Sequence, residues 1–415
     1  MPKDRPASAI LRTAMSNMIP CLIALPIGAA TGALDALFGR VLLAIGVLRD
    51  AHLVPLVAAL PLAGLAIVWM YRRFGGRAGE GMGLVFEVGL GRDGEIPLRL
   101  IPLVMLSTWA THLTGGSAGR EGVAVQMGAA LSHQVGRILA PLGHDFGNTF
   151  LIMGMAAGFS GLFHTPLAAT AFAMEVLVAG NMAYRSLFPA LVAALVSCAT
   201  SEWLGLTPFV APISHLPTLD AGLGVRIVVL GIACGVVGGG FAWALARAKS
   251  TAARVVNPYL RVAGMGAVLS ILILSLGHGR YAGLGTNLIG MGIAGSGIEP
   301  WDWALKFALT AATLAAGFQG GEVTPLFSIG ASLGAAVAPL LGLPVPLAAA
   351  LGYVGVFCGA TNTFLAPVLI AAEIFGFGTL PLAFLLCAAS YSCNRNSSIY
   401  AKQLIAAHPT QARPR

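Results

Sequence analysis

The chain has 415 residues and a formal net charge of +8; 57% of its residues are hydrophobic and only 10% are charged. An ordinary soluble domain has roughly 25% charged residues, and the mean hydropathy here is +0.84. This composition predicts an integral membrane protein in a lipid bilayer and excludes a soluble domain. The basic residues lie in short segments between apolar runs, as membrane topology signals do, so we expect no nucleic-acid partner.

Uncharged runs recur along the whole chain, and most are long enough for a membrane helix of roughly 17–25 residues. They cover residues 13–34, 51–71, 100–119, 146–174, 186–201, 227–246, 262–279 and 374–394. Proline interrupts the first two runs at Pro20, Pro26, Pro55 and Pro61. We predict a single all-α membrane domain, residues 1–415, with broken and re-entrant helices that line a cavity.

Four basic clusters lie between or beside these runs. They are Lys3, Arg5 and Arg12; Arg72, Arg73 and Arg77; Arg247, Lys249, Arg254 and Arg261; and Lys402, Arg413 and Arg415. Basic residues favour the cytoplasmic side of a membrane, so the clusters predict a multi-pass protein with both termini in the cytoplasm. No small-residue cleavage site follows the first apolar run, which we therefore expect to be retained.

Two glutamates lie among glycines in apolar surroundings. Glu121 belongs to Gly-Arg-Glu-Gly-Val at 119–123, and Glu322 belongs to Gly-Gly-Glu-Val-Thr-Pro at 320–325. No Asp, Glu, Lys or Arg occurs from residue 323 through residue 372. A carboxylate inside a membrane is costly, and such residues usually face a path for substrates or ions. The two motifs therefore predict an ion path.

The order of motifs occurs twice along the chain. Gly119, Glu121, Gly128, Ala129 and Leu131 correspond to Gly320, Glu322, Gly330, Ala331 and Leu333 once one residue is inserted. Gly161, Thr165, Leu167, Ala168 and Glu175 correspond to Gly359, Thr363, Leu365, Ala366 and Glu373. We predict two halves, residues 1–215 and 216–415, that form an inverted repeat and are joined by the polar segment 212–220.

The glycines around Glu121 allow a mechanism. Gly119 and Gly122 let the backbone approach an ion and turn into a helix, whose first N–H groups lack intrahelical partners and attract anions. Pro325 suits the first turn of a second such helix after Thr324. A deprotonated Glu121 would compete with an anion for these donors, and a protonated Glu121 would leave them while carrying a proton. The pattern predicts coupled anion and proton movement.

Several polar residues also have structural interpretations. Glu121 could instead pair with the adjacent Arg120 at a helix end, whereas Glu322 has no cation beside it, so we expect no local ion pair there. The equivalent positions of Glu175 and Glu373 favour an architectural role, such as capping or a subunit contact. The remaining candidates are isolated histidines and cysteines, which we interpret as interior groups: His112, His164, Cys21, Cys198, Cys234, Cys358, Cys387 and Cys393. We expect no metal site and no cofactor.

The motif Gly119-Arg120-Glu121-Gly122, followed by Gln126 and Gly128, resembles the Gly-Arg-Glu-Gly-x-x-x-Gln-x-Gly motif of the CLC family of anion channels and proton-coupled exchangers. The resemblance covers nearly the whole chain. It implies the inverted-repeat CLC fold, a homodimer with one pore per subunit, and Glu121 as the external gating glutamate.

Two departures resemble the fluoride-specific branch of the family. Met82, in Gly-Met-Gly-Leu-Val at 81–85, stands where chloride transporters have a serine that contacts the anion. At 320–325, Val323 replaces an aromatic residue, and Glu322 and Thr324 enter the pore region. The resemblance also places Val176 near the usual internal proton glutamate, which makes Glu322 the candidate replacement.

The resemblance extends to further anion-binding candidates. Tyr400 lies in the region of the family's pore-lining tyrosine, with Tyr391 as a competitor, and Phe86 is a candidate aromatic edge, although core packing is an equal alternative. The full set of expected anion-binding residues is Met82, Gly83, Phe86, Gly119, Arg120, Gly122, Val123, Val323, Thr324 and Tyr400.

These features predict a fluoride/proton antiporter of the bacterial inner membrane, with fluoride and protons as its substrates. The alternatives are a chloride/proton exchanger or passive anion channel of the same fold, an intramembrane enzyme that uses Glu121 and Glu322 as acid and base, and a scaffold that transports nothing. We favour a transporter over an enzyme because no nucleophile or metal ligands accompany the two glutamates.

Overall fold

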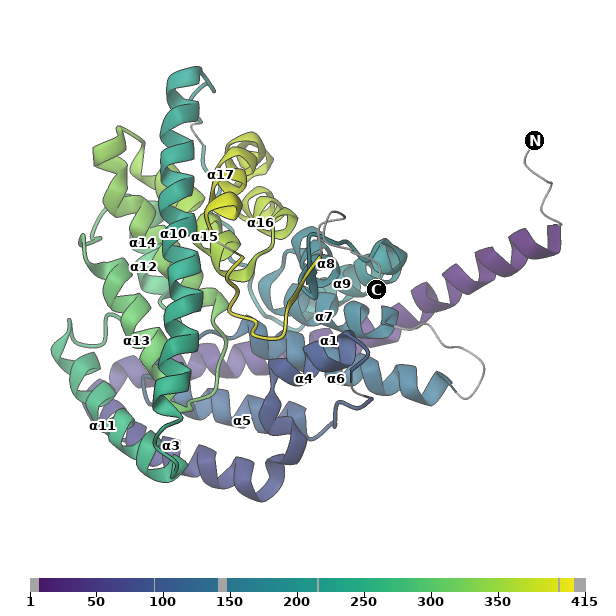
Figure 1. The fold of residues 1–415 in the computed structure, drawn as a ribbon, viewed down its shortest axis with the longest axis horizontal. Coiled ribbons are helices and arrows are strands. Elements are labelled where there is room, and N and C mark those ends of the chain that lie inside the picture. The colour runs from purple at the N-terminus through teal and green to yellow at the C-terminus, as the bar shows by residue number, and fades with distance from the viewer. Residues whose placement is uncertain (1–6, 93, 141–147, 215, 395, 407–415) are drawn as a thin grey trace, which may run out of the picture.

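The structure is a computed structural model that describes residues 7–92, 94–140, 148–214, 216–394 and 396–406, with side chains from residue 18 onward. Helices dominate these residues, as predicted, and two short strands, β1 (Val178–Ala179) and β2 (Leu404–Ile405), pair in parallel (Figure 1). The helices are α1 (Ala7–Ala51), α2 (Leu53–Ala58), α3 (Leu60–Met70), α4 (Met82–Gly89), α5 (Leu100–Leu113), α6 (Glu121–Leu139), α7 (Thr149–Phe163), α8 (Pro166–Glu175), α9 (Leu187–Trp203), α10 (Ala221–Ala252), α11 (Pro258–Ser275), α12 (Thr286–Ala294), α13 (Asp302–Ala316), α14 (Val323–Leu341), α15 (Val345–Thr361), α16 (Leu365–Phe375) and α17 (Leu380–Cys393).

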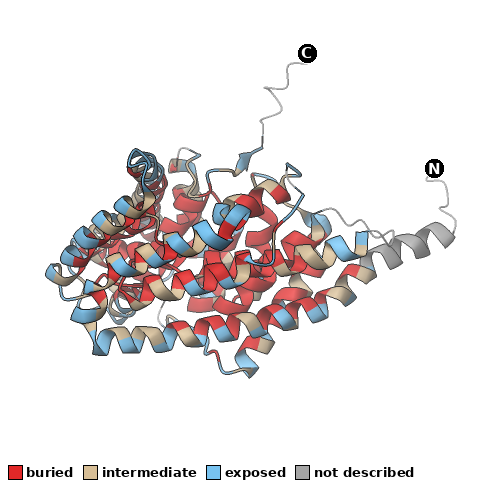
Figure 2. Ribbon diagram, turned by 90° about the horizontal axis from the view of Figure 1, so that it is seen from below, coloured by how far each residue is buried: buried red, intermediate tan, exposed pale blue. Residues whose placement is uncertain are grey.

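The fold contains both long and short apolar helices. Among the described residues, five helical segments are long and apolar enough to cross a membrane: Met18–Ala51, Tyr184–Trp203, Ala221–Ala252, Pro258–Ser275 and Val323–Leu341. Several other apolar helices, such as α5, α7 and α16, are shorter. Buried residues fill the interior and exposed residues lie along the outer faces of the helices (Figure 2). The exposed residues include large apolar ones, such as Leu62, Val236 and Trp243. The multi-pass membrane prediction is confirmed.

The prolines of the first two apolar runs have different effects. Pro20 and Pro26 lie inside α1, which continues to Ala51, so the prediction of a break there is wrong. A proline removes one helical hydrogen bond, but packing against neighbouring helices lets a membrane helix continue, and α1 packs on α7 and α9. The second run does break, at Ala59 between α2 and α3, where Pro61 lies in the first turn of α3.

The helices of the two parts of the chain pack in the same order. α6 packs on α7 as α14 packs on α15, α1 packs on α9 as α10 packs on α17, and α5 packs on α6 as α13 packs on α14. Corresponding helices also meet one another: α3 meets α11, α6 meets α14, and α8 meets α16. This packing agrees with two related halves. The predicted division after residue 215 stays a prediction, and residue 215 itself lies outside the described residues.

Glycines allow the closest of these helix contacts. A Cβ atom at Gly128 in α6 would overlap the carbonyl oxygen of Gly154 in α7, and a Cβ atom at Gly330 in α14 would overlap that of Gly352 in α15. Small residues at such crossings let backbones approach, which is how membrane helices associate without a hydrophobic driving force. Gly128 and Gly330 are equivalent in the sequence comparison of the two halves, so the same contact occurs twice.

The two remaining paired glutamates cap each other's helices. Glu373, in α16, accepts hydrogen bonds from Leu167 N at 3.0 Å and Ala168 N at 2.9 Å, at the start of α8. Glu175, in α8, accepts hydrogen bonds at the start of α16, from Leu365 N at 3.1 Å and Ala366 N at 2.8 Å. Each carboxylate satisfies N–H groups that have no intrahelical partner and complements the positive end of a helix dipole. The capping alternative of the sequence analysis is therefore what the structure contains.

We expect Glu373→Gln to lower the free energy of unfolding by about 1–3 kcal/mol, because the amide has one acceptor for two N–H groups. Thermal unfolding of the purified protein in detergent measures this change. Glu202→Gln is the control, since Glu202 is exposed at the end of α9. Equal unfolding temperatures for the two variants would contradict the capping role.

Candidate functional site

The two glutamate motifs meet in the interior of the protein. Gly119 N donates a hydrogen bond to Gly321 O at 2.5 Å, and Gly321 N donates one to Gly119 O at 2.8 Å. This isolated antiparallel bridge holds the turn before α6 against the turn before α14. The starts of the two helices, Glu121 and Val323, therefore lie side by side, and unpaired N–H groups of both helices face a common region.

The Glu121 carboxylate lies on donors from the opposite helix. The Glu121 side chain is completely buried, and its Oε2 accepts hydrogen bonds from Thr324 N at 3.0 Å and from Thr324 Oγ1. Arg120 N also donates to Oε2 at 3.3 Å, while Arg120 Nε lies 3.7 Å from Oε1. The local pair with Arg120, one alternative of the sequence analysis, is thus present but longer than the contacts with Thr324.

Glu322 has a partner that the sequence did not indicate. It precedes α14, its side chain is 18% exposed, and its Oε1 lies 3.5 Å from Lys249 Nζ. The expectation of no local ion pair stands, since the partner is 73 residues away in the chain and is brought close by the packing of α10 on α14. The two glutamates thus differ, since Glu121 is sealed inside the protein and Glu322 reaches solvent beside a cation.

Two aromatic rings form a further wall. Tyr400 and Phe86 stack with their ring centres 5.1 Å apart. The segment that carries Tyr400 is held by two interactions. These are the pairing of β2 with β1 and a hydrogen bond from Ile399 N to Ala360 O. Among the described residues, the buried Tyr400 hydroxyl has no hydrogen-bond partner. This wall therefore contains a free hydroxyl donor.

The remaining predicted residues lie at the starts of helices. Met82 is the first residue of α4 and packs against the main hydrophobic core, and the Gly83 Cα lies beside the Lys402 side chain. The start of α4 adjoins α6, because Gly81 lies against the Gln126 amide. Val123 and Val323 are buried in the first turns of α6 and α14. The roles of Met82, Gly83, Val123 and Val323 in binding an anion stay predictions.

Lys306 is a site residue that the sequence analysis missed. It is completely buried in α13, and its Nζ donates to Ser117 Oγ at 2.9 Å, Tyr281 O at 3.1 Å and Gly283 O at 2.7 Å. No described carboxylate contacts this ammonium group. Lys306 therefore ties the turn before α6 to the loop before α12, and its amino group contacts Ser117, four residues before Glu121. Its position as the one charge between residues 303 and 321 was an available signal.

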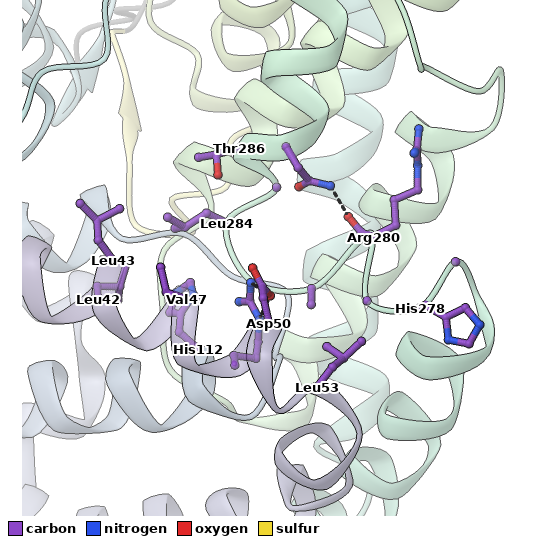
Figure 3. Close-up of a pocket in the computed structure, with 17 residues that line it drawn as sticks. Leu42, Leu43, Val47, Asp50, Leu53, His112, His278, Arg280, Leu284 and Thr286 are labelled. Carbon is purple, nitrogen blue, oxygen red and sulfur yellow. Dashed lines mark hydrogen bonds and ion pairs between the residues drawn. The ribbon is translucent and has the colours of Figure 1, made fainter.

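A cavity of about 520 Å³ opens beside this turn, between the end of α1, His112 of α5 and the loop that carries Arg280 (Figure 3). His112 lines the cavity, and its Nε2 lies 3.4 Å from Gly119 O. Gly119 is two residues from Glu121. The cavity thus reaches the residue that contacts the turn before α6, and its wall also includes the charged residues Arg49, Asp50 and Arg280.

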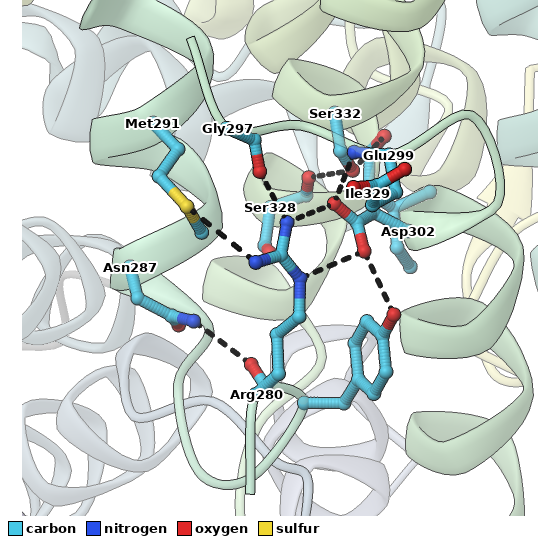
Figure 4. Close-up of polar contacts among 10 residues, drawn as sticks. Arg280, Asn287, Met291, Gly297, Glu299, Asp302, Ser328, Ile329 and Ser332 are labelled. Atoms are coloured by element: carbon cyan, nitrogen blue, oxygen red, sulfur yellow. Dashed lines mark hydrogen bonds and ion pairs between the residues drawn. The ribbon is translucent and has the colours of Figure 1, made fainter. Parts of the chain in front are cut away.

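Arg280 fixes one side of this cavity (Figure 4). Its Nε donates to Asp302 Oδ1 at 2.9 Å and its Nη2 contacts Asp302 Oδ2 at 2.5 Å, and the bond with Asp302 raises the pKa of the guanidinium. The Tyr281 hydroxyl donates to the same carboxylate at 2.7 Å. The network anchors the loop whose carbonyl groups hold Lys306.

A buried carboxylate between two facing helix starts, in a bundle of long and short apolar helices, is the architecture of ion channels and transporters. The family model described as voltage gated chloride channel matches residues 62–395. The chain belongs to this family, the CLC family.

Relatives of known name agree with this assignment. The chain is 37% identical to the chloride/fluoride channel protein of Pseudomonas syringae pv. tomato, over 86% of this chain and 79% of that protein. It is 26% identical to the voltage-gated ClC-type chloride channel ClcB of Salmonella dublin, over 74% of this chain and 76% of that protein.

Solved structures have the same fold. The crystal structure of a CLC-type fluoride/proton antiporter is similar with a TM-score of 0.92 at 45% identity, over 94% of this chain and 98% of that chain. A slow cyanobacterial Cl⁻/H⁺ antiporter is similar in fold, with a TM-score of 0.78 at 18% identity, over 92% of this chain and 96% of that chain. The predicted CLC fold is confirmed.

The bridge between the two turns predicts different effects for two nearby glycines. A Cβ atom at Gly119 would lie 2.8 Å from Pro325 Cδ and 2.9 Å from Gly321 O, whereas one at Gly122 would meet Gly321 Cα at 3.5 Å, an ordinary contact. We expect Gly119→Ala to destabilise the protein by about 1–3 kcal/mol and Gly122→Ala to leave thermal stability nearly unchanged. Equal unfolding temperatures for the two variants would show that the turns are not packed this closely.

We expect Lys306→Met to reduce anion flux by about tenfold, because the cation attracts anions toward the Glu121 region. It should also lower the free energy of unfolding by about 1–3 kcal/mol, since three oxygen acceptors lose their donor. Flux from liposomes and thermal unfolding measure the two effects. Arg247→Met, an exposed substitution in α10, is the control, and unchanged flux in Lys306→Met would refute the role of this charge.

Proposed function

We propose that the protein exports fluoride across the bacterial inner membrane in exchange for protons, with Glu121 as the gate and proton carrier. The observation that carries this proposal is the buried Glu121 carboxylate on the Thr324 N–H and hydroxyl. These are donors that a small anion would use. The names of two relatives, a chloride/fluoride channel protein and a fluoride/proton antiporter, support fluoride as the anion.

The exchange follows from competition for the same donors. In the deprotonated state, the Glu121 carboxylate accepts from Thr324 and excludes an anion. After protonation, the carboxyl group is a weaker acceptor, because hydrogen bonds to charged acceptors are roughly twice as strong as those to neutral ones. An anion then takes the Thr324 donors, and the side chain moves away with its proton. A bound anion and a deprotonated Glu121 therefore exclude each other, which couples the two fluxes.

The residues on either side of Glu121 supply a path. On the external side, ions enter through the cavity beside His112, whose wall carries two arginines, Arg49 and Arg280, each paired with an aspartate. On the cytoplasmic side, the Glu322 carboxylate exchanges protons with water, since it is partly exposed and contacts Lys249 of a basic cluster. Tyr400 donates its free hydroxyl to the anion between these two sides.

Selectivity comes from the number and strength of the donors. The Thr324 N–H and hydroxyl form a compact pair for a small, strongly hydrated anion. Met82 brings a thioether, which is no donor, to the place where chloride-transporting relatives have a hydroxyl. Weaker binding of chloride follows from that loss. The functional unit is a homodimer with one pore in each subunit.

A second candidate function is chloride transport, either as an exchanger or as a passive channel. The name of the Salmonella relative, a voltage-gated ClC-type chloride channel, favours it. The chloride/fluoride channel of Pseudomonas syringae agrees with both candidates. Members of the CLC family move ions as transporters or channels, and selectivity and proton coupling separate the two candidates.

The test uses purified protein in liposomes loaded with equal fluoride and chloride, with a fluoride electrode and a pH electrode outside. We expect fluoride efflux with proton uptake and little chloride release. In Glu121→Gln, which cannot carry the proton, proton uptake linked to fluoride should fall at least about a hundredfold, to the leak of empty liposomes. Glu202→Gln is the control carboxylate variant, with unchanged coupling expected.

Other outcomes decide against the proposal. Chloride release comparable to fluoride release would favour the chloride transporter. Fluoride flux without proton movement in the unmodified protein would indicate a channel. Proton-coupled fluoride flux that persists in Glu121→Gln would show that another group carries the proton.

A further inference from the structure

A groove on the outer surface has an apolar wall and a basic end. We call it the α3–α5 groove. Its lining residues are Trp69, Met70, Arg73, Phe74, Arg99, Pro102, Leu103 and Leu106. They come from the end of α3, the π-helical turn at Tyr71–Gly75 and the start of α5. The groove encloses about 570 Å³.

The apolar wall lies open on the outside of the protein. Trp69 is 57% exposed, Phe74 is 49% exposed and Leu106 is 51% exposed. The Trp69 and Phe74 rings meet edge to face with centres 5.9 Å apart, which fixes both at the end of the apolar helix α3. Tryptophan is enriched where hydrocarbon meets lipid headgroups. The wall therefore matches the depth at which a lipid headgroup joins its chains.

The basic end has two guanidinium groups without anionic partners. Among the described residues, no carboxylate lies within ion-pair distance of Arg73 or Arg99. In contrast, Arg77 lies 3.7 Å from Glu80 and Arg137 lies 2.8 Å from Glu95. The Arg73 guanidinium lies over the Phe74 ring, 5.4 Å from its centre. Two positive charges are thus held beside an apolar wall.

Arg99 is held close to the turn that follows α3. Its guanidinium occupies the space that a side chain at Gly76 would need: a Cβ atom there would lie 2.6 Å from Nη2. Gly76 has a φ of +49°, which glycine adopts readily. Arg99 also lines an adjacent hollow of about 400 Å³ with Arg77, Gln134 and Glu95, whose carboxylate is paired with Arg137, and this hollow leaves room for a headgroup next to the α3–α5 groove.

We propose that the α3–α5 groove binds an anionic phospholipid. Arg73 and Arg99 bind the phosphate, for which guanidinium groups have the matching donor geometry, and an acyl chain lies against Trp69, Leu103 and Leu106. Basic pockets at the ends of membrane helices recognise anionic lipids in this way. The charge of the two arginines selects an anionic lipid over a zwitterionic one, and the apolar wall selects a lipid over a free phosphate.

Native mass spectrometry of the purified protein, with phosphatidylglycerol or phosphatidylcholine added in detergent, tests the proposal. We expect bound phosphatidylglycerol in excess of phosphatidylcholine. The double variant Arg73→Gln/Arg99→Gln should bind phosphatidylglycerol about tenfold or more weakly. The matched control is Arg247→Gln/Arg254→Gln, which removes two exposed arginines of another basic cluster. Thermal unfolding in lipid-free detergent verifies that both double variants fold.

Three results would overturn the proposal. The first is equal phosphatidylglycerol binding by the unmodified protein and Arg73→Gln/Arg99→Gln. The second is an equal loss of phosphatidylglycerol binding in the control double variant. The third is displacement of the lipid by soluble glycerol phosphate at comparable concentration. The second result would mean that surface charge in general attracts the lipid. The third would mean that the groove recognises a phosphate without its chains. Retained lipid in the control and no displacement would support the phospholipid site.

Discussion

The pair of backbone hydrogen bonds between Gly119 and Gly321 is the constraint on which the site depends. It places the starts of α6 and α14 next to each other, and only residues without a side chain allow this approach. Because both helices direct unpaired N–H groups to one region, a buried carboxylate can be tolerated there. Glu121 takes this position and reaches Thr324 across the contact, so one side chain connects the two halves and occupies the donors that the proposed anion needs.

Two other carboxylates also accept hydrogen bonds from N–H groups at the start of a helix in the opposite half. Glu175 caps α16 and Glu373 caps α8, each from the opposite half of the chain. In both carboxylates, each oxygen accepts from a backbone N–H group. Glu121 differs, because its Oε1 has no hydrogen-bond partner among the described residues. The proposed movement of Glu121 rests on this difference.

The sequence predicted much of the fold because the glycines and glutamates of the two halves recur in the same order. It also predicted that Pro325 lies in the first turn of a helix, and α14 begins at Val323. It failed where distant segments supply a partner. Lys249 reaches Glu322 only through the packing of α10, and Lys306 reaches Ser117 only through that of α13. Pro20 and Pro26 misled the helix prediction, because local propensity does not include the neighbouring helices that support α1.

The central claim is that an anion binds to the Thr324 donors only when Glu121 is protonated. Calorimetric titration of the purified protein with fluoride, in buffers of different ionisation enthalpy at one pH, counts the protons taken up on binding. The account predicts uptake of up to about one proton for each fluoride bound in the unmodified protein and none in Glu121→Gln. Fluoride binding without proton uptake in the unmodified protein, at a pH where Glu121 is ionised, would contradict it.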